Sequence, residues 1–595
     1  LQAATADKSK AILFTFIYQF FEKKQKIVFI EGSTRDISVK MQLFDFSEPL
    51  IVYTLLGGLI VFYGLVSLVI KERLYISESL VATIMGLILG PACLRLIDPT
   101  EWGYKSAITE ELTRIVLAIQ IMTAAINLPR AYITRQFRSM FIMLLPVMSW
   151  MWISSAAIIY FFIPDVTFVE TLLIASCITP TDPILANSVV QGSFAEKHIP
   201  PNVRHLLSAE SGVNDGMGFP FLFFALFLLE SKITATAVCQ WISFVWGYHI
   251  LLSIVIGIVI GWAARKLLGM AESRDWIDKE SFLVFAFALA IFVVGGVSIV
   301  GSDALLACFM AGTSFSWDDW FREETQDAHL QDVIDLLLNL TIFMYIGMIL
   351  PWSSFNSDDI SLKSLIAISV LILVFRRLPI VILFKGFIPA FHTFKEAAFA
   401  GYFGPIGIGA IFLAMTVEKE ISIRLNEGLN DIDEGSMLRI QEMTFPIVTF
   451  IVLSSVIVHG ITVPILNIGS RIDIERFPSI ASISSQVARL PVIDFVESLS
   501  LERDNKGRVR KKEKMKAEYA PKNSEELYQD VHNVDIEEEQ SERNGVYTYN
   551  HIETDVLIES NKDEQSDQDN VNSADYHWLQ SSECSSNAQC DTDHN

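Results

Sequence analysis

Long apolar stretches recur along the chain between residues 50 and 467 and alternate with short polar segments. A helix needs ~20 predominantly apolar residues to cross a bilayer core about 30 Å thick. Thirteen segments approach that length: 50–70, 77–97, 110–128, 139–163, 168–191, 205–229, 243–268, 281–300, 302–316, 330–350, 361–384, 396–416 and 442–467. The pattern predicts an all-α polytopic membrane protein with about 13 transmembrane helices, spanning residues 49–467.

Composition supports this prediction and separates the two ends from the apolar region. The chain is 51% hydrophobic with a mean hydropathy of +0.40, which is too apolar for a soluble protein of 595 residues. Residues 518–595 hold 20 acidic against 3 basic side chains, so most of the net charge of −23 belongs to this tail. We expect 1–48 to be a leader of unknown role and 468–595 to be a cytosolic region, acidic and largely disordered from 518.

Lysine and arginine in the short loops predict the orientation. Loops after odd-numbered spans carry 14 of these residues and loops after even-numbered spans carry 6. Because cytoplasmic loops are enriched in positive charge, the odd-numbered loops and the C-terminal tail are predicted to be cytoplasmic.

The fifth span contains "CITPTDPILANSVV", in which Pro180 and Pro183 flank Asp182. Each proline removes a backbone donor and disfavours a continuous helix. A broken helix inside a bilayer must face protein or a watery cavity. Freed carbonyl groups, the Thr181 hydroxyl and the Asp182 carboxylate would form an oxygen-rich site for a small, hard cation. A proline kink with a hydrogen-bonded aspartate is the alternative.

The sixth span, "LLSAESGVNDGMGFPFLF", places four polar side chains within six residues. Glu210 and Asn214 are four residues apart, as are Ser211 and Asp215, so each pair shares a face of a helix. Buried carboxylates that lie close together cannot all stay charged without a cation. Cations and protons would therefore compete for this cluster, and Glu210 could alternatively belong to a structural ion pair.

Two arginines and a further aspartate lie in other apolar spans. Arg376 and Arg377 lie within the eleventh span and need anionic partners if they do not reach the interface. We predict that one of them, with a slight preference for Arg377, pairs with Glu210. Asp303 starts the ninth span and is either part of a cation path or the N-cap of that helix.

The twelfth and thirteenth spans hold two further features. The stretch "GYFGPIGIGAIF" (401–412) has four glycines and a proline, which indicates either close helix packing or a second broken helix crossing the first. His459, near the end of the last span, is better interpreted as a packed or interfacial histidine than as a proton carrier.

These motifs together resemble the fungal plasma-membrane Na⁺(K⁺)/H⁺ antiporters of the sodium/proton exchanger superfamily. The matching motifs are "ITPTDPILANSVV", "HLLSAESGVNDGMGFPFLF", "FRRLPIVI", "GYFGPIGIGAIF" and "SSVIVHG", and the resemblance covers about 45–470. It implies inverted repeats of six helices, two broken helices crossing at the ion site, elevator-like alternating access and a homodimer.

The resemblance also implies roles for individual residues. Asp215 would be the main carrier of the ion and the proton, with Asp182, Thr181 and Ser211 as further ligands. Na⁺ would thus bind at Asp182, Ser211 and Asp215. Asn214 would hold the cluster in place, and Glu210 would pair with an arginine of the eleventh span.

The chain departs from its fungal relatives at two positions of the cation path. Asn127 in "INLPR" and Ser302 in "SDALL" stand where these relatives tend to carry acids, which leaves Asp303 alone in the second motif. We hypothesise that the loss of two carboxylates alters the choice between Na⁺ and K⁺.

The predicted function is secondary antiport: export of Na⁺, with Li⁺ and K⁺ as further candidate substrates, in exchange for H⁺ across the plasma membrane. Such activity would serve salt tolerance and cytosolic pH homeostasis. The chain carries neither a P-loop nor an HExxH motif, so we expect no enzyme activity and no cofactor. The expected partners are the bilayer, a second copy of the chain and cytosolic regulators of the tail, without nucleic acid. A cation channel or a non-transporting salt sensor on the same fold is the alternative.

Overall fold

The computed structural model describes the apolar region almost completely. It covers residues 29–31, 40–42, 48–99, 102–190, 199–230, 235–325, 330–357, 359–427 and 434–471. The chain divides into two compact units, Leu1–Leu501 and Glu502–Asn595, and every described residue belongs to the first. The prediction of a disordered tail and most of the leader prediction therefore lie outside the described residues.

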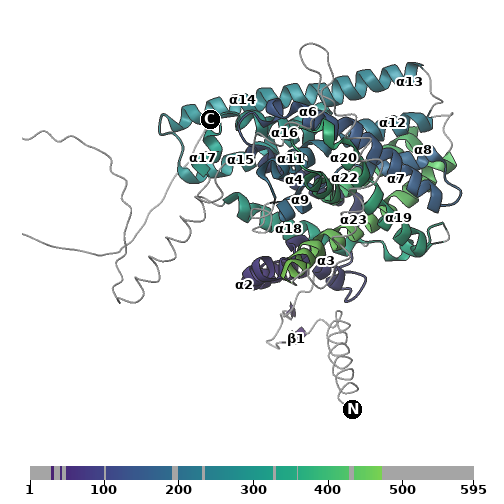
Figure 1. Cartoon of the computed structure of the whole chain (residues 1–595). Coiled ribbons are helices and arrows are strands. Elements are labelled where there is room, and N and C mark those ends of the chain that lie inside the picture. Colours follow the sequence, from purple (N-terminus) through teal and green to yellow (C-terminus); the bar gives the residue numbers. More distant parts are fainter. Residues whose placement is uncertain are drawn as a thin grey trace, which may run out of the picture. The chain divides into compact units, whose positions relative to one another are not determined.

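Helices make up nearly all of the described structure (Figure 1). The α-helices are α2 (Glu48–Leu68), α3 (Glu78–Leu89), α4 (Lys105–Ile126), α5 (Tyr132–Arg135), α6 (Phe137–Ile142), α7 (Met148–Phe162), α8 (Phe168–Cys177), α9 (Pro183–Val190), α11 (Pro201–Asn214), α12 (Gly218–Glu230), α13 (Ala235–Gln240), α14 (Leu252–Glu272), α15 (Lys279–Val300), α16 (Ala304–Phe315), α17 (Trp320–Thr325), α18 (Leu330–Ile349), α19 (Leu362–Phe375), α20 (Leu378–Phe384), α21 (Phe394–Tyr402), α22 (Ile408–Glu427) and α23 (Glu434–Arg471). Wider π-helical turns are η1 (Val69–Leu74), η3 (Met143–Val147) and η4 (Trp241–Leu251), and 3₁₀ turns are η6 (Trp352–Asn356) and η7 (Lys385–Phe387). The two short strands β1 (Phe29–Glu31) and β2 (Lys40–Gln42) pair antiparallel within the leader.

Eight helical stretches of the described chain are long and apolar enough to cross a membrane. They are 49–71, 137–162, 201–230, 238–272, 279–300, 332–349, 362–387 and 435–462. Three shorter apolar helices, α3, α8 and α16, have between 10 and 17 residues. The all-helical membrane fold is confirmed, whereas the count of thirteen spans stays a prediction, because several expected spans are short, charged or broken.

Local sequence explains where several of these helices begin. Ser77 accepts a hydrogen bond from Leu80 N at 3.3 Å and so starts α3. Thr167 and Glu170 form a capping box at the start of α8. In both cases a side chain satisfies a backbone group that has no partner within the first turn.

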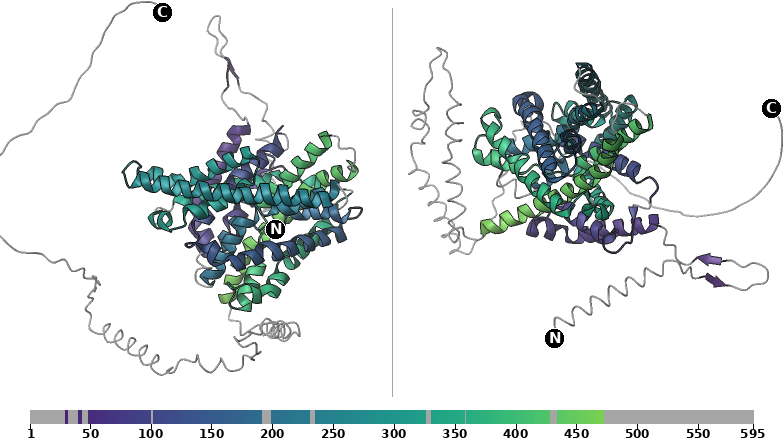
Figure 2. Two further views of the ribbon diagram at one scale, coloured as in Figure 1. Left: turned by 90° about the horizontal axis from the view of Figure 1, so that it is seen from above. Right: turned by 90° about the vertical axis from the view of Figure 1, so that its right-hand side faces the viewer.

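Small residues allow several helices to pack closely. A Cβ atom on Gly86 of α3 would lie 2.9 Å from the carbonyl carbon of Met344 in α18, so only glycine fits there. Gly257 and Gly261 of α14 lie in the same way against Ala307 and Ala311 of α16. Such contacts bring helix backbones together where lipid supplies no hydrophobic driving force. Figure 2 shows the long α14 helix crossing the other helices on one side of the bundle.

Two membrane segments are broken in the middle of the bundle. One break separates α8 from α9 at residues 178–182, and the other separates α21 from α22 at residues 403–407. Figure 1 shows α9 and α22 near the centre, beside α4 and α11. The stretch 401–412 is therefore a second broken helix, one of the two predictions made for it.

Candidate ion-binding site

Asp182 occupies the first break and starts α9. Its Oδ1 accepts hydrogen bonds from Ile184 N at 2.8 Å and Leu185 N at 2.9 Å. The side chain is 1% exposed. This is the usual geometry of an aspartate N-cap, and the positive end of the helix dipole also stabilises the negative charge.

The same residue connects the two breaks. Asp182 N donates to Pro405 O at 2.9 Å, and Asp182 Oδ2 accepts from Ile408 N at 2.5 Å. Ile408 is the first residue of α22, so one carboxylate caps the N-termini of both α9 and α22. A Cβ atom on Gly407 would lie 2.9 Å from Asp182 Cβ, and glycine is required for this approach. The two broken helices therefore cross at Asp182.

Arg376 donates hydrogen bonds to the carbonyl groups at the C-terminal ends of α8 and α21. Its guanidinium donates to Ile178 O, to Thr179 O and Pro180 O at 3.3 Å each, and to Gly404 O at 2.6 Å. These carbonyl groups follow α8 and α21 and carry the negative ends of the two helix dipoles. Positive charge thus lies at the C-terminal ends of α8 and α21, and negative charge lies at the N-terminal ends of α9 and α22.

Asp215 lies beside this crossing with no partner for its carboxylate. It follows the last residue of α11 and is 1% exposed. Among the described residues, neither of its carboxylate oxygens has a hydrogen-bond partner. A Cβ atom on Gly409 of α22 would lie 2.8 Å from Asp215 Cγ, so the carboxylate rests directly against the α22 backbone. An unpaired buried carboxylate is costly unless a proton or a cation neutralises it.

Three polar side chains connect the first break to α11. Thr181 Oγ1 lies 3.1 Å from Ser211 Oγ and accepts a hydrogen bond from Asn214 Nδ2 at 2.7 Å. All three are buried, and Asn214 Oδ1 has no hydrogen-bond partner within the described chain. Asn214 immediately precedes Asp215, so its bond to Thr181 orients the end of α11 relative to the break.

The structure separates the two adjacent arginines into different roles. Arg377 forms a two-pronged ion pair with Glu210, with Nη1–Oε1 and Nη2–Oε2 distances of 2.5 and 2.7 Å. Both side chains are 3% exposed. Arg377 Nε also donates to Ala400 O at 3.0 Å. Glu210 is therefore paired with Arg377, and Arg376 binds backbone carbonyl groups instead.

Asp303 caps a helix and also faces the Asp215 region. Its Oδ1 accepts from Leu305 N at 3.0 Å and Leu306 N at 3.1 Å, which starts α16. Its Oδ2 has no partner among the described residues, and a Cβ atom on Gly216 would lie 2.6 Å from that oxygen. Gly216 directly follows Asp215, so this oxygen of Asp303 lies against the backbone beside Asp215. The two roles predicted as alternatives for Asp303, a cap and a part of the cation path, are thus geometrically compatible.

The two departures from the fungal pattern lie in different surroundings. Ser302 is buried, and its Oγ lies 2.8 Å from Ser253 Oγ and 2.9 Å from Tyr248 O. Asn127 follows α4 as its C-cap and is exposed. The structure therefore brings Ser302 next to the residue that caps α16, and it leaves Asn127 at a helix end.

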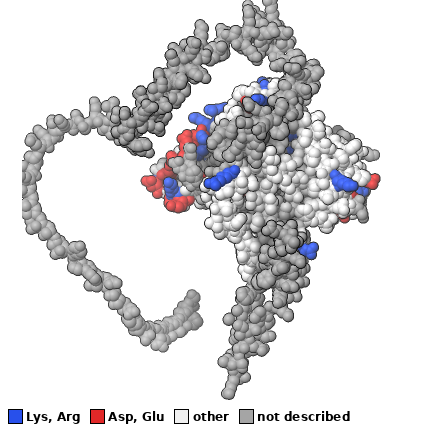
Figure 3. All heavy atoms as spheres, turned by 60° about the horizontal axis from the view of Figure 1, so that its bottom comes forward, with Lys and Arg blue, Asp and Glu red and all other residues white. Residues whose placement is uncertain are grey.

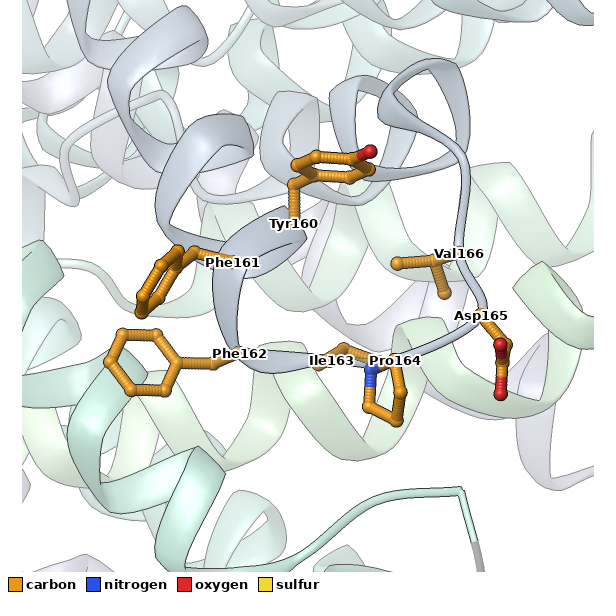
Figure 4. A pocket seen from close by; sticks show the side chains of 7 residues that line it. All are labelled: Tyr160, Phe161, Phe162, Ile163, Pro164, Asp165 and Val166. Carbon is orange, nitrogen blue, oxygen red and sulfur yellow. The ribbon is translucent and has the colours of Figure 1, made fainter.

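Other candidate sites are weaker. In the part of the chain that the structure describes, no group of three or more His, Cys, Asp or Glu side chains could hold a metal ion. A cation at the crossing would therefore need hydroxyl and carbonyl oxygens beside the carboxylates. A surface pocket formed by residues 160–166 is lined by one continuous turn, with Asp165 as its single charged side chain (Figure 4).

The sequence-based prediction missed the backbone contribution of α22. Gly407 and Gly409 allow the carboxylates of Asp182 and Asp215 to approach, and Ile408 N donates to Asp182. The spacing of glycines in "GPIGIG" was the available signal, but pattern alone does not say which side chain approaches a glycine. The prediction also assigned no role to Arg376 other than as an alternative partner of Glu210.

Comparisons with known proteins found a matching family and several relatives. The family model described as "Sodium/hydrogen exchanger, transmembrane" matches residues 58–468. A probable Na⁺/H⁺ antiporter of Schizosaccharomyces pombe is 43% identical over 72% of this chain and 57% of its own length. A Na⁺/H⁺ antiporter of Saccharomyces cerevisiae is 41% identical over 72% of this chain and 44% of its own length. The chain thus spans about half the length of these two relatives.

A solved structure shows the same fold. The sodium proton antiporter MjNhaP1 of Methanocaldococcus jannaschii superimposes with a TM-score of 0.54 at 20% identity. The superposition covers 70% of this chain and all of that protein.

Proposed function

We propose that this chain, which belongs to the sodium/hydrogen exchanger family, exchanges Na⁺ for H⁺ across a membrane without using nucleotide. The observation that carries the proposal is the state of Asp215. Its carboxylate is buried in the bundle, and neither oxygen has a hydrogen-bond partner among the described residues. A carboxylate in such surroundings is stable only as the acid or as the ligand of a cation. Of the two relatives named above, one is named a Na⁺/H⁺ antiporter and the other a probable Na⁺/H⁺ antiporter.

The proposed mechanism is competition between the two ions at one site. Asp215 would release its proton when Na⁺ binds and would take up a proton when Na⁺ leaves, so the two ions move in opposite directions. Asp182, Ser211 and Thr181 would supply further oxygen ligands. Asn214 would hold Thr181 toward the cation, because its amide already donates to that hydroxyl.

The crossed helices fit a site that must open alternately to the two sides. Asp182 and Arg376 bind backbone groups of both breaks, so α8–α9 and α21–α22 would move as one body with the ion. Broken helices at the membrane midplane are the usual location of ion sites in secondary transporters. We propose elevator-like movement of this body within each subunit of a homodimer.

The biological setting follows from the direction of exchange. We propose that the chain lies in the plasma membrane with its C-terminal tail in the cytoplasm and exports Na⁺, driven by the inward proton gradient. In Figure 3 most of the described surface carries no charged side chain, as expected for a surface in lipid. Expression in cells that lack their own sodium efflux should restore salt tolerance more strongly at acid than at neutral external pH.

The deciding experiment measures exchange in proteoliposomes containing the purified full chain. With an acidic interior, external Na⁺ should dissipate the pH gradient, and the Asp215→Asn variant should reduce this response to background. The matched control is Asp165→Asn, which removes the exposed acid of the surface pocket at residues 160–166 and should behave like the parent protein. Size-exclusion profiles of the purified variants verify folding.

The other outcomes exclude the proposal. Sodium current with no change in internal pH would indicate a cation channel. Absence of both flux and current in the folded protein would indicate a salt sensor. Retained exchange in Asp215→Asn would contradict the assignment of the site.

Ion preference forms a second part of the proposal. We propose that Asn127 and Ser302 shift the choice among Na⁺, Li⁺ and K⁺, because each stands where fungal relatives tend to carry an acid. An aspartate at 302 would point at the Tyr248 carbonyl that Ser302 now binds, and it would need a cation nearby. The double variant Asn127→Glu/Ser302→Asp should change the ratio of K⁺-driven to Na⁺-driven exchange. An unchanged ratio would refute this role.

A further inference from the structure

The break between α21 and α22 leaves backbone groups without helical partners. The last carbonyl groups of α21 and the first N–H groups of α22 need other donors and acceptors, because a buried polar group without a partner costs free energy. Asp182 and Arg376 satisfy Ile408 N, Pro405 O and Gly404 O. Two groups of the break, Tyr402 O and Ile406 N, are bound by neither of these charged residues.

Both groups are bound by side chains of α23, and Tyr402 O also accepts a hydrogen bond from Gly404 N at 3.1 Å. His459 Nε2 lies 3.2 Å from Tyr402 O, and Ser455 Oγ accepts a hydrogen bond from Ile406 N at 2.8 Å. His459 Nδ1 lies 3.3 Å from Ser455 Oγ, so the two side chains also contact each other. His459 is 4% exposed and Ser455 is fully buried. One turn of α23 thus binds both sides of the break.

The hydrogen-bonding capacity of these groups limits what they can do together. A carbonyl oxygen only accepts, so the contact with Tyr402 O needs a hydrogen on Nε2, and the contact of Nδ1 with the Ser455 carbonyl oxygen at 3.0 Å needs one on Nδ1. With the hydrogen on Nε2, the ring donates to Tyr402 O, and Ser455 Oγ, which receives the Ile406 hydrogen, can donate its own hydrogen to Nδ1.

These hydrogen bonds from α23 lie close in sequence to the contacts of the ion site. Ile406 is two residues before Ile408, whose N–H donates to the Asp182 carboxylate, and three residues before Gly409, against which the Asp215 carboxylate rests. A shift of Ile406 would move both contacts. Displacements of about 1 Å at a positioned site are enough to reduce its activity strongly.

We propose that His459 and Ser455 form a clamp on the second broken helix that positions the start of α22 for cation binding at Asp182 and Asp215. They are positioning residues, since they act through the backbone of 402–406 and not on the ion. This inference rests on the proposed ion exchange for its effect on transport, but the clamp itself is a statement about backbone contacts.

The test compares neighbouring serines of α23. Ser455→Ala removes the acceptor of Ile406 N, whereas Ser454→Ala removes only a hydroxyl bonded within its own helix, to Phe450 O. Hydrogen exchange measured by mass spectrometry on full-length protein in nanodiscs should show about three- to tenfold faster exchange in peptides covering 403–408 for Ser455→Ala, as for one lost hydrogen bond. Ser454→Ala should leave exchange in these peptides unchanged.

Transport gives the second readout. Ser455→Ala and His459→Leu should raise the apparent KM for Na⁺ about three- to tenfold with a smaller change in maximal rate. His459→Gln, which keeps an N–H donor for Tyr402 O, should recover most of the affinity. Equal hydrogen exchange in Ser455→Ala and Ser454→Ala would overturn the clamp. So would an unchanged KM in both Ser455→Ala and His459→Leu.

The two readouts separate the clamp from the proposed function. If the parent protein does not exchange Na⁺ for H⁺, the proposed function fails, and the hydrogen-exchange comparison still decides the clamp. If the parent protein exchanges normally and the serine variants do not differ, only the clamp fails.

Discussion

At the residue scale, the charged groups in the bundle differ in what neutralises them. Glu210 and Arg377 neutralise each other, and Arg376 is surrounded by carbonyl groups. Asp182 accepts backbone N–H groups from two helices. Asp215 alone among these five has neither an opposite charge nor a hydrogen-bond donor in the described structure. This difference, and not the presence of an acid in a span, is the reason for proposing Asp215 as the residue that exchanges its counter-ion.

The ion pair between Glu210 and Arg377 gives a stability prediction. Glu210→Gln leaves the Arg377 charge buried without a counter-charge, which should destabilise the protein by about 3–5 kcal/mol. The measurement is thermal unfolding in detergent, followed by fluorescence-detected size exclusion. The double variant Glu210→Gln/Arg377→Gln should recover part of the loss, because no charge is then left alone.

An exposed ion pair provides the control. Glu111, which is 56% exposed and bonds Arg114, should tolerate replacement by Gln with a change of less than about 1 kcal/mol. If Glu210→Gln unfolds at the same temperature as Glu111→Gln, the buried pair does not have the structural role that its geometry suggests.

At the element scale, broken helices present free backbone groups in the centre of the bundle, which continuous helices cannot do. A continuous helix satisfies its own backbone groups, so its middle offers nothing to an ion. The breaks at 178–182 and 403–407 expose helix ends in the centre of the bundle, where side chains from α11, α19–α20 and α23 reach them. Proline and glycine in these two segments are therefore part of the site.

Gly409 allows a test of this close packing. Gly409→Ala adds a Cβ atom 2.8 Å from Asp215 Cγ, and the carboxylate must shift although alanine is the better helix former by about 1 kcal/mol. We expect the apparent affinity for Na⁺ in the vesicle assay to fall by about tenfold or more.

Gly295 of α15 is the matched glycine, because a Cβ atom there would have nothing within 4 Å. Gly295→Ala should leave Na⁺ affinity unchanged. Unaltered affinity in Gly409→Ala would mean that the Asp215 carboxylate can move away without loss, and that its contact with α22 is unimportant for the ion.

At the scale of the whole molecule, the candidate ion site and the residues that position it lie between Ile178 and His459, within the segment 58–468 matched by the family model. We propose that the long C-terminal region acts on regulation and not on the exchange step.

Deletion of 518–595 tests this division. The shortened protein should keep Na⁺-dependent dissipation of the pH gradient in proteoliposomes, with any difference limited to its dependence on internal pH or on cytosolic factors. Complete loss of exchange in a protein that still elutes as a single folded species would show that the tail takes part in transport itself.

The sequence by itself determined the class of protein and predicted most of the residues that make up the candidate site. Apolar segments of about 20 residues predict helices that span a bilayer. A charge or a proline inside such a helix costs free energy, which indicates that the residue has a functional or structural role. Asp182 and Asp215 were predicted on this basis, and the family match to 58–468 agrees with the fold. The boundaries of individual spans were less predictable, because short and broken helices satisfy their ends through neighbours that are distant in sequence.

Only the tertiary structure decided how these residues divide their roles. Arg376 and Arg377 are adjacent and chemically equal in the sequence, yet one binds four backbone carbonyl groups and the other binds Glu210. His459 is an ordinary buried histidine until its partner, Tyr402 O, is known. These contacts join residues that are 28 to 198 positions apart. The local sequence pattern shows which polar groups are buried at a cost in free energy. The groups that compensate this cost come from other helices, and only the packing of those helices brings them there.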